Sequence, residues 1–263
     1  MATLVCFHAP PDDESIATGG TMAAAAEDGH TVVLVVATQG ELGEVPEGFL
    51  DDGETLAERR VKETLASAEV LGVKAVEWLG YCDSGMVDTP DNDNPECFWQ
   101  CDVEEAAERL AAILRAHDAD ALTIYDSHGN YGHPDHIQVH RVGLRAAELA
   151  GVDAVYEATV NRDEMKRGME AMAANGLTEG FEIPDFEAMD LGVPEAVLTH
   201  RIDVTRYVDR KRASMRCHAS QIGEQSFFLA MPDEQFTVAF GTEWYIRHGA
   251  TPAAAGEWAT SIF

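Results

Sequence analysis

The stretch TVVLVVAT, residues 31–38, decides the fold class. It is a near-continuous run of apolar, mostly β-branched residues, which is typical of a strand buried on both faces, as in a parallel sheet. A helix-like stretch at about 15–28, ended by Gly29, comes before it, and a short apolar run at 3–7 comes before that helix. Strand, helix and strand together predict a βαβ unit.

The same alternation continues along the chain to about residue 160. It predicts strands at 76–79, 121–125 and 154–157 and helices at 54–71, 103–117 and 136–149. Alternating elements of this kind favour an α/β fold, here a Rossmann-like, mostly parallel sheet with flanking helices.

The last third of the chain is less regular. Its pattern predicts helices at 165–174 and 207–219 and strands at 198–204 and 244–247. Because no Ser/Gly linker, repeat or low-complexity segment interrupts the sequence, we expect a single domain over 1–263. Residues 1–160 would form its α/β core, and residues 161–263 a C-terminal extension that completes the fold.

Composition excludes some classes of partner. The chain has 47 Asp and Glu against 18 Lys and Arg, a formal charge of −29, which disfavours binding to nucleic acid or to an anionic membrane surface. No run approaches the roughly 20 apolar residues of a membrane helix, and the N-terminus turns acidic before a signal-peptide core is complete. We therefore expect a cytoplasmic protein, with homo-oligomerisation left open. Its five cysteines, an odd number, do not suggest a disulfide framework, and the spacing of Cys97 and Cys101 is a weak zinc signal.

Two clusters of histidine and carboxylate follow predicted strands. Residues 8–14 read HAPPDDE after the first strand, and residues 126–136 read DSHGNYGHPDH after the strand at 121–125. Ligands in open α/β sheets bind at the carboxyl ends of strands, so the two clusters could converge on one divalent ion, and mixed imidazole and carboxylate donors suit zinc. The alternative for the first cluster is helix capping by its acids.

The second cluster also carries a family resemblance. The segment YGHPDH at 131–136 resembles the signature of the PIG-L/LmbE superfamily of zinc-dependent N-acetylglucosamine deacetylases. Segments 60–72 and 79–86, and more loosely 218–221 and 240–243, resemble the actinobacterial branch that makes mycothiol or cleaves its S-conjugates. The resemblance implies a Zn²⁺-dependent hydrolase, a deacetylase or amidase. Its substrate would be a small molecule, an N-acetylglucosaminyl-type or mycothiol-like glycoside, whose N-acyl amide is cleaved by metal-activated water.

The same resemblance implies roles for residues of the first cluster and its partner. Asp13 and His136 would bind the zinc ion, and Asp12 would be the general base that deprotonates the metal-bound water. These roles agree with the chemistry of the residues, because one of two adjacent carboxylates can bind a metal while its neighbour accepts a proton.

Further roles implied by the resemblance concern the substrate. His133, oriented by Asp135, would stabilise the oxyanion or protonate the leaving amine, and Tyr131 would polarise the amide carbonyl. Arg60 and Asp83 would hold sugar hydroxyl groups. For these last two, a surface ion pair and a turn-forming aspartate are the plain alternatives.

One position departs from the family pattern. Where the motif has a zinc-binding histidine, this chain has Pro10, whose side chain offers no metal donor. His8 is the natural replacement as metal ligand because residues two apart on an extended segment share a face, and His128 is a lesser candidate. If no residue replaces the lost ligand, the chain is a metal-poor pseudoenzyme or sugar-binding protein, or a repurposed, non-hydrolytic enzyme on the same scaffold.

Two long loops, 39–53 and 81–102, would form the rim of the pocket, since long loops in compact domains are often functional. They contain Glu41, Glu44 and Trp99, which could recognise sugar hydroxyls or stack on a ring, although exposed acids in so acidic a chain are also simply solvated.

Overall fold

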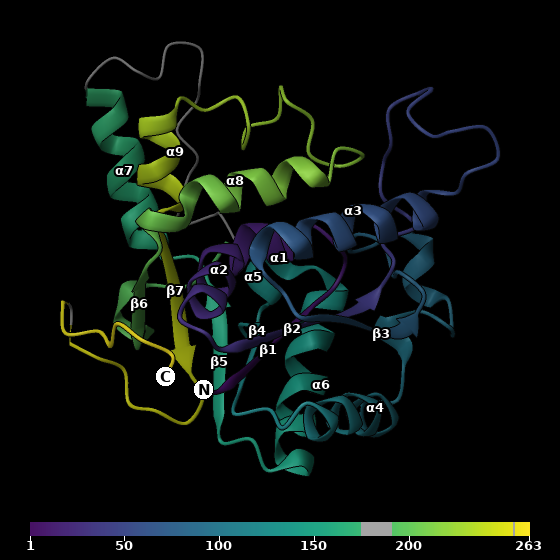
Figure 1. Cartoon of the computed structure of the whole chain (residues 1–263), viewed down its shortest axis with the longest axis horizontal. Helices are drawn as coiled ribbons and strands as arrows, with labels where there is room; N and C mark the ends of the chain where they lie inside the picture. Colours follow the sequence, from purple (N-terminus) through teal and green to yellow (C-terminus); the bar gives the residue numbers. More distant parts are fainter. Residues whose placement is uncertain (175–190, 255) are drawn as a thin grey trace.

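A computed structural model of the chain describes residues 1–174, 191–254 and 256–263. Its centre is a seven-stranded sheet of order β3-β2-β1-β4-β5-β7-β6 (Figure 1). The strands are β1 (Thr3–His8), β2 (Thr31–Thr38), β3 (Ala75–Tyr81), β4 (Ala121–Tyr125), β5 (Ala154–Thr159), β6 (His200–Asp203) and β7 (Thr242–Arg247). The first five in sequence are parallel, and β7 runs antiparallel to both β5 and β6. The α/β, mostly parallel class is therefore confirmed.

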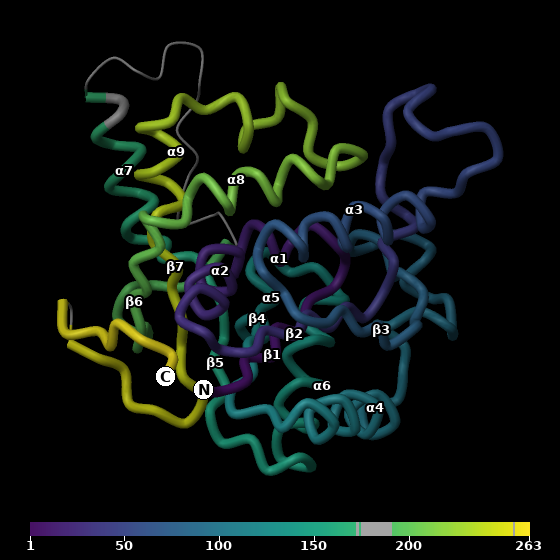
Figure 2. Tube along the Cα trace, viewed as in Figure 1, coloured from purple at the N-terminus to yellow at the C-terminus, as the bar shows by residue number. Residues whose placement is uncertain are grey.

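Helices cover both faces of the sheet, as Figures 1 and 2 show. The α-helices are α1 (Asp13–Ala17), α2 (Gly19–Glu27), α3 (Leu56–Leu71), α4 (Val103–Ala116), α5 (Gly129–Gly132), α6 (Pro134–Ala150), α7 (Arg162–Ala174), α8 (Val208–Cys217) and α9 (Asp233–Phe240). Helices α4 and α6 pack on one face, and α2 and α3 on the other, where α8 lies across α1, α2 and α3. Within the described residues, no helix combines the length and apolar character needed to cross a bilayer.

Strand β2 shows why the sheet is buried on both sides. Val33 and Val35 belong to the core under α4 and α6, whereas Val32, Leu34 and Val36 belong to the core under α2. All five are fully buried. The alternation of side chains along a strand thus sends an unbroken apolar run into two cores, as predicted.

The predicted helix at 15–28 is in fact two helices. Helix α1 ends and α2 begins at Thr18, which has φ −133° and lies outside helical geometry. Residues Gly19 and Gly20 follow, and a Cβ on Gly20 would lie 2.5 Å from the side chain of Val204. Periodicity alone does not show this break.

The capping residues of α3 and α6 place side chains for the site. Thr55 and Glu58 form a capping box at the start of α3, and Gly72 ends it in the left-handed conformation. His133 caps α6, with Pro134 as the first helical residue. The 17 residues of α6 begin directly at the motif that the sequence singled out.

The structure adds elements that the sequence pattern did not predict. Helix α9 is one of them, in the C-terminal part of the chain. Short 3₁₀ turns at Pro90–Asp93 and Phe98–Gln100 are others, within the loop at 81–102. Strands β6 and β7 extend the sheet beyond β5, so residues after 160 take part in the same sheet as those before it.

Candidate functional site

The two sequence clusters meet at the carboxyl ends of β1 and β4. The Nε2 atom of His136 lies 3.0 Å from Oδ2 of Asp13, although the residues are 123 positions apart. The His136 ring is fully buried and stacks on Tyr125 at 4.0 Å between centroids, and its Nδ1 donates to the carbonyl oxygen of Gly129 at 3.2 Å. Burial alone would lower the pKa of His136, but the adjacent Asp13 carboxylate outweighs it and raises the pKa.

His133 lies beside His136, with 4.9 Å between the ring centroids. Its Nδ1 accepts a hydrogen bond from the backbone N–H of Asp135 at 3.1 Å, so the neutral ring carries its proton on Nε2. Burial, reinforced by the charge of His136, lowers the pKa of His133 to about 4. Tyr131 meets both rings edge-on and is 43% exposed, which places it at the mouth of the site.

Asp135 contacts His133 through its main chain, while its side chain points to another loop. Its Oδ2 accepts from the backbone N–H of Ser84 at 3.1 Å, and its buried Oδ1 has no hydrogen-bond partner. Burial raises the pKa of this carboxyl to about 7. The main chain of Asp135, and not its carboxylate, therefore orients His133 in this structure, while the carboxylate holds the loop at 81–102.

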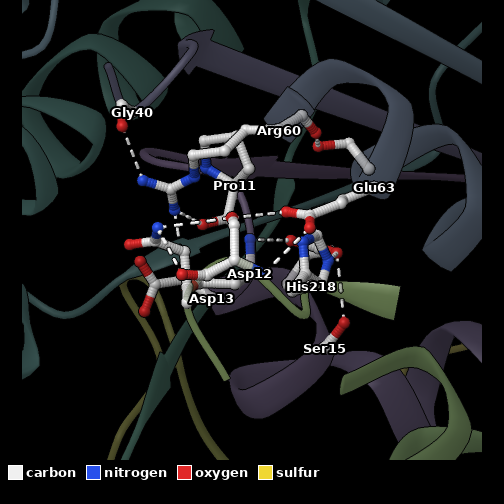
Figure 3. A network of polar contacts seen from close by, with 12 residues as sticks. Pro11, Asp12, Asp13, Ser15, Gly40, Arg60, Glu63 and His218 are labelled. Atoms are coloured by element: carbon white, nitrogen blue, oxygen red, sulfur yellow. Dashed lines mark hydrogen bonds and ion pairs between the residues drawn. The ribbon is translucent and has the colours of Figure 1, made fainter. Parts of the chain in front are cut away.

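Asp12 stands next to Asp13 in an unusual backbone conformation, with φ 89°. Its carboxylate lies 3.5 Å from the Nη2 atom of Arg60, and its side chain is 17% exposed (Figure 3). Burial and the charge of Asp13 raise the pKa of Asp12 to about 7, against the opposing effect of Arg60. A carboxylate with such a pKa is suited to accept a proton near neutral pH.

Arg60 is buried beneath this turn. It donates to the carbonyl oxygens of Gly40 and Pro11, which fixes the turn that carries Asp12 (Figure 3). A Cβ on Gly40, which has φ +65°, would lie 2.2 Å from Nη1 of Arg60, so the loop approaches the guanidinium where only glycine fits.

Asp83 connects the two long loops. Its own N–H donates to Oε1 of Glu41 at 2.8 Å, and its carboxylate accepts from the N–H groups of Gly85 at 2.8 Å and Leu42 at 3.4 Å. The loops at 39–53 and 81–102 are thus joined reciprocally, and Glu41 serves this junction. The side chain of Trp99 instead packs against the guanidinium of Arg141, 4.8 Å from the ring centroid.

His8 does not present a free nitrogen to the site. Its Nδ1 pairs with the hydroxyl of Tyr125 and its Nε2 with the hydroxyl of Thr18, each at 2.9 Å, in a side chain that is 1% exposed. Burial lowers the pKa of His8 to about 4. The expectation that His8 replaces the ligand lost at Pro10 therefore does not match this geometry, because both ring nitrogens of His8 are hydrogen-bonded in the core.

Asp13 and His136 are spaced as two ligands of one zinc ion would be. Two ligands of a tetrahedral zinc at about 2.0–2.1 Å lie about 3.3 Å apart, close to the 3.0 Å between Asp13 and His136. Catalytic zinc centres use three protein ligands, and in the part of the chain that the structure describes no three His, Cys, Asp or Glu side chains are arranged to hold a metal. Two donors fit, and the described residues place no third donor beside them.

Two residues at the site carry no role in the sequence interpretation. Glu14 and His218 form a fully buried pair, with 2.6 Å between Oε1 and Nε2. In the sequence, Glu14 is one of the acids that could cap a helix. His218 lies in the segment 218–221, whose resemblance is loose and implies no function. Only the fold brings them together, because they are 204 residues apart.

Comparison with known proteins identifies the family. Residues 5–147 match the model of the PIG-L family, described as GlcNAc-PI de-N-acetylase. A curated relative, 1D-myo-inositol 2-acetamido-2-deoxy-alpha-D-glucopyranoside deacetylase of Acidothermus cellulolyticus, is 40% identical over 269 residues, covering 98% of this chain and 92% of its own. The chain belongs to the PIG-L family. The resemblance noted from the YGHPDH motif is thereby confirmed.

Solved structures show the same PIG-L fold at low sequence identity. The zinc-inhibited form of teicoplanin deacetylase matches with a TM-score of 0.61 and 18% identity, covering 95% of this chain and all of that one. The 4-carboxy-2-hydroxymuconate hydratase of Pseudomonas putida KT2440 matches with a TM-score of 0.58 and 19% identity, covering 97% and 99%. A deacetylase and a hydratase thus share this architecture, so function has to be argued from the site.

Proposed function

We propose that this PIG-L protein is a hydrolase that removes the N-acyl group of a small N-acetylglucosaminyl-type or mycothiol-like glycoside. The observation that carries the proposal is that Asp13, His133 and His136 lie together, with Asp12 next to Asp13 in sequence and the half-exposed Tyr131 against both rings. The 40% identity with a deacetylase of an inositol-linked 2-acetamido sugar supports the reaction and the substrate class.

In this proposal, water adds to the amide carbonyl carbon and the C–N bond breaks, giving a free amine and a carboxylate. Asp12 takes the proton from water, since its pKa near 7 matches that task. His133, neutral because burial lowers its pKa, donates from Nε2 to the developing oxyanion. The proton on Asp12 is then available for the leaving amine, and Arg60 keeps the turn bearing Asp12 in place.

A zinc ion would be held by Asp13 and His136, and when bound it supplies a Lewis acid that lowers the pKa of water. The carbonyl of Gly129 accepts from Nδ1 of His136, which leaves Nε2 as the donor toward the metal. Because Pro10 contributes nothing, we expect weaker zinc binding than three protein ligands would give.

The test is acetate and amine release from an N-acetylglucosaminyl-inositol by the purified, zinc-supplemented protein. We expect turnover in the native protein and a loss of about 10²-fold or more in kcat for Asp12→Ala, the range for removing a general base. The variant should still fold, which circular dichroism checks, and Glu69→Ala on the exposed face of α3, outside both loops, is the control. Full turnover in Asp12→Ala would disprove the mechanism.

The second candidate is a sugar-binding protein without catalysis. It is favoured by the engaged nitrogens of His8 and by the lack, among the described residues, of three His, Cys, Asp or Glu side chains arranged to hold a metal. Calorimetry with the same glycoside distinguishes the two. Binding without acetate release, together with no zinc retained after dialysis against zinc, supports this candidate.

A further inference from the structure

A buried acid–imidazole pair lies directly beneath the turn that carries Asp12. Glu14 and His218 are both fully buried, and Nε2 of His218 donates to Oε1 of Glu14 at 2.6 Å (Figure 3). Glu14 comes from α1, whereas His218 is the first residue after α8. The turn after α8 holds the ring, because the carbonyl of His218 accepts from the N–H groups of Gln221 and Ile222.

Every acceptor position of Glu14 has a use. Oε1 also accepts from the hydroxyls of Ser67 at 2.7 Å and Ser15 at 3.1 Å, while Oε2 accepts from the backbone N–H of Asp12 at 2.8 Å. Burying a carboxylate is costly unless it is paired and hydrogen-bonded. Burial would raise the pKa of Glu14, but His218 and the Ser67 hydroxyl lower it to about 2, so Glu14 is a carboxylate.

The hydrogen bond from Asp12 to Glu14 matters because of the backbone at Asp12. Its φ of 89° lies in the left-handed region, which a non-glycine residue occupies only when surrounding contacts hold it there. The same turn points the Asp12 carboxylate toward Arg60 at 3.5 Å. The contact with Glu14 therefore bears on where the carboxylate of Asp12 lies.

We infer that His218, acting through Glu14, is a positioning residue for Asp12. His218 donates to Oε1 of the Glu14 carboxylate, and Oε2 of the same carboxylate accepts from the N–H of Asp12. Together these contacts hold the carboxylate of Asp12 in its place beside Arg60. The inference rests on the proposed function, in which Asp12 accepts the proton of water. In this inference the C-terminal part of the chain supplies His218, which acts on Asp12 through Glu14.

The test compares three variants of the full chain. His218→Leu removes the N–H donor, and His218→Gln restores a neutral donor of similar reach. Met215→Ala, in the buried face of the same helix and outside the network, is the control for simple loss of packing. Measurements are kcat, KM, zinc content, thermal midpoint and hydrogen exchange of the Asp12 amide.

We expect His218→Leu to lower kcat by about tenfold, less than the roughly 10²–10⁴-fold that a positioned acid or base contributes, because Asp12 itself is retained. KM and zinc content should be unchanged. Its Asp12 amide should exchange faster. His218→Gln should recover most of the kcat, and Met215→Ala should lower the thermal midpoint while leaving both kcat and the Asp12 amide unaffected.

Three results would overturn the inference. The first is an unchanged kcat in His218→Leu, and the second is an equal loss of kcat in His218→Leu and in the control Met215→Ala. The third is an Asp12 amide that stays protected from exchange in His218→Leu. If the native protein releases no acetate, the proposed function fails, yet amide exchange in the same variants still decides whether His218 positions Asp12.

Discussion

At the scale of single residues, the site is distinguished by what stands at position 10. The chain provides Asp13 and His136 at 3.0 Å from each other, while His8 is bound to Tyr125 and Thr18. Pro10 lies between His8 and Asp13 in the sequence, and its side chain has no atom that can bind a metal. The strength of metal binding should therefore be limited by one missing side chain.

This leads to a prediction for Pro10→His. An imidazole as third ligand, beside Asp13 and His136, should raise zinc affinity by about tenfold or more, because catalytic zinc centres ordinarily have three protein ligands. Competition against a chromogenic chelator measures it. Pro10→Ala is the matched control, since it removes the proline ring without adding a donor, and an equal gain in that variant would contradict the explanation.

At the scale of elements, helix α3 joins the parts of the site. Arg60, Glu63 and Ser67 lie at spacings of three and four residues, so they share one face of the helix. Arg60 holds the turn before Asp12, and Ser67 donates to Glu14. Glu63 accepts from both the N–H and the hydroxyl of Ser220, at 2.9 and 2.6 Å.

Glu63 therefore gives a prediction at this scale. Glu63→Ala should lower the free energy of unfolding by about 1–3 kcal/mol, because it leaves the buried N–H of Ser220 without an acceptor. Urea denaturation measures the change. Glu69→Ala on the exposed face of the same helix is the control and should have little effect. Equal stability of the two variants would show that Glu63 does not hold the 218–221 turn.

Sequence pattern predicted elements well where local rules decide them. The apolar run of β2 and the capping and glycine signals around α3 have local causes, and these elements lie where they were expected. The close approach of Gly20 to Val204 and the engagement of His8 by Tyr125 and Thr18 are different. Such features are set by contacts between distant segments, which periodicity does not contain.

The same distinction applies to the candidate site. The motif at 131–136 and the acids at 12 and 13 could be placed at strand ends from the sequence alone. The pairing of Glu14 with His218 could not, because neither residue type nor spacing links positions 204 residues apart. The contact between the carboxylate of Asp135 and Ser84, which lies on another loop, could not be predicted from the sequence either.

At the scale of the whole molecule, residues after 160 complete the sheet and the site. Strand β7 pairs with β5, and the buried Lys211 of α8 pairs with Glu243 at 2.6 Å. Oε1 and Oε2 of Glu243 accept from the N–H groups of Gly20 and Thr21, at the start of α2. The two parts of the chain thus share buried charges as well as strands.

We therefore predict that a chain ending at residue 160 does not fold cooperatively. It would leave β5 as an open edge and expose the apolar residues that α8 covers. Thermal unfolding followed by circular dichroism measures this, with the full chain as control. A sharp transition in the shortened chain would show that residues 1–160 are an independent domain, against the single-domain expectation.

The 204-residue separation of Glu14 and His218 also bears on how the protein is made. The imidazole that pairs with Glu14 leaves the ribosome 204 residues after Glu14 itself. Contacts between such distant residues form late and slowly. A nascent chain can therefore form its first strands while the Glu14 carboxylate still lacks its imidazole partner. Competence for catalysis should arise only after α8 and His218 have been translated.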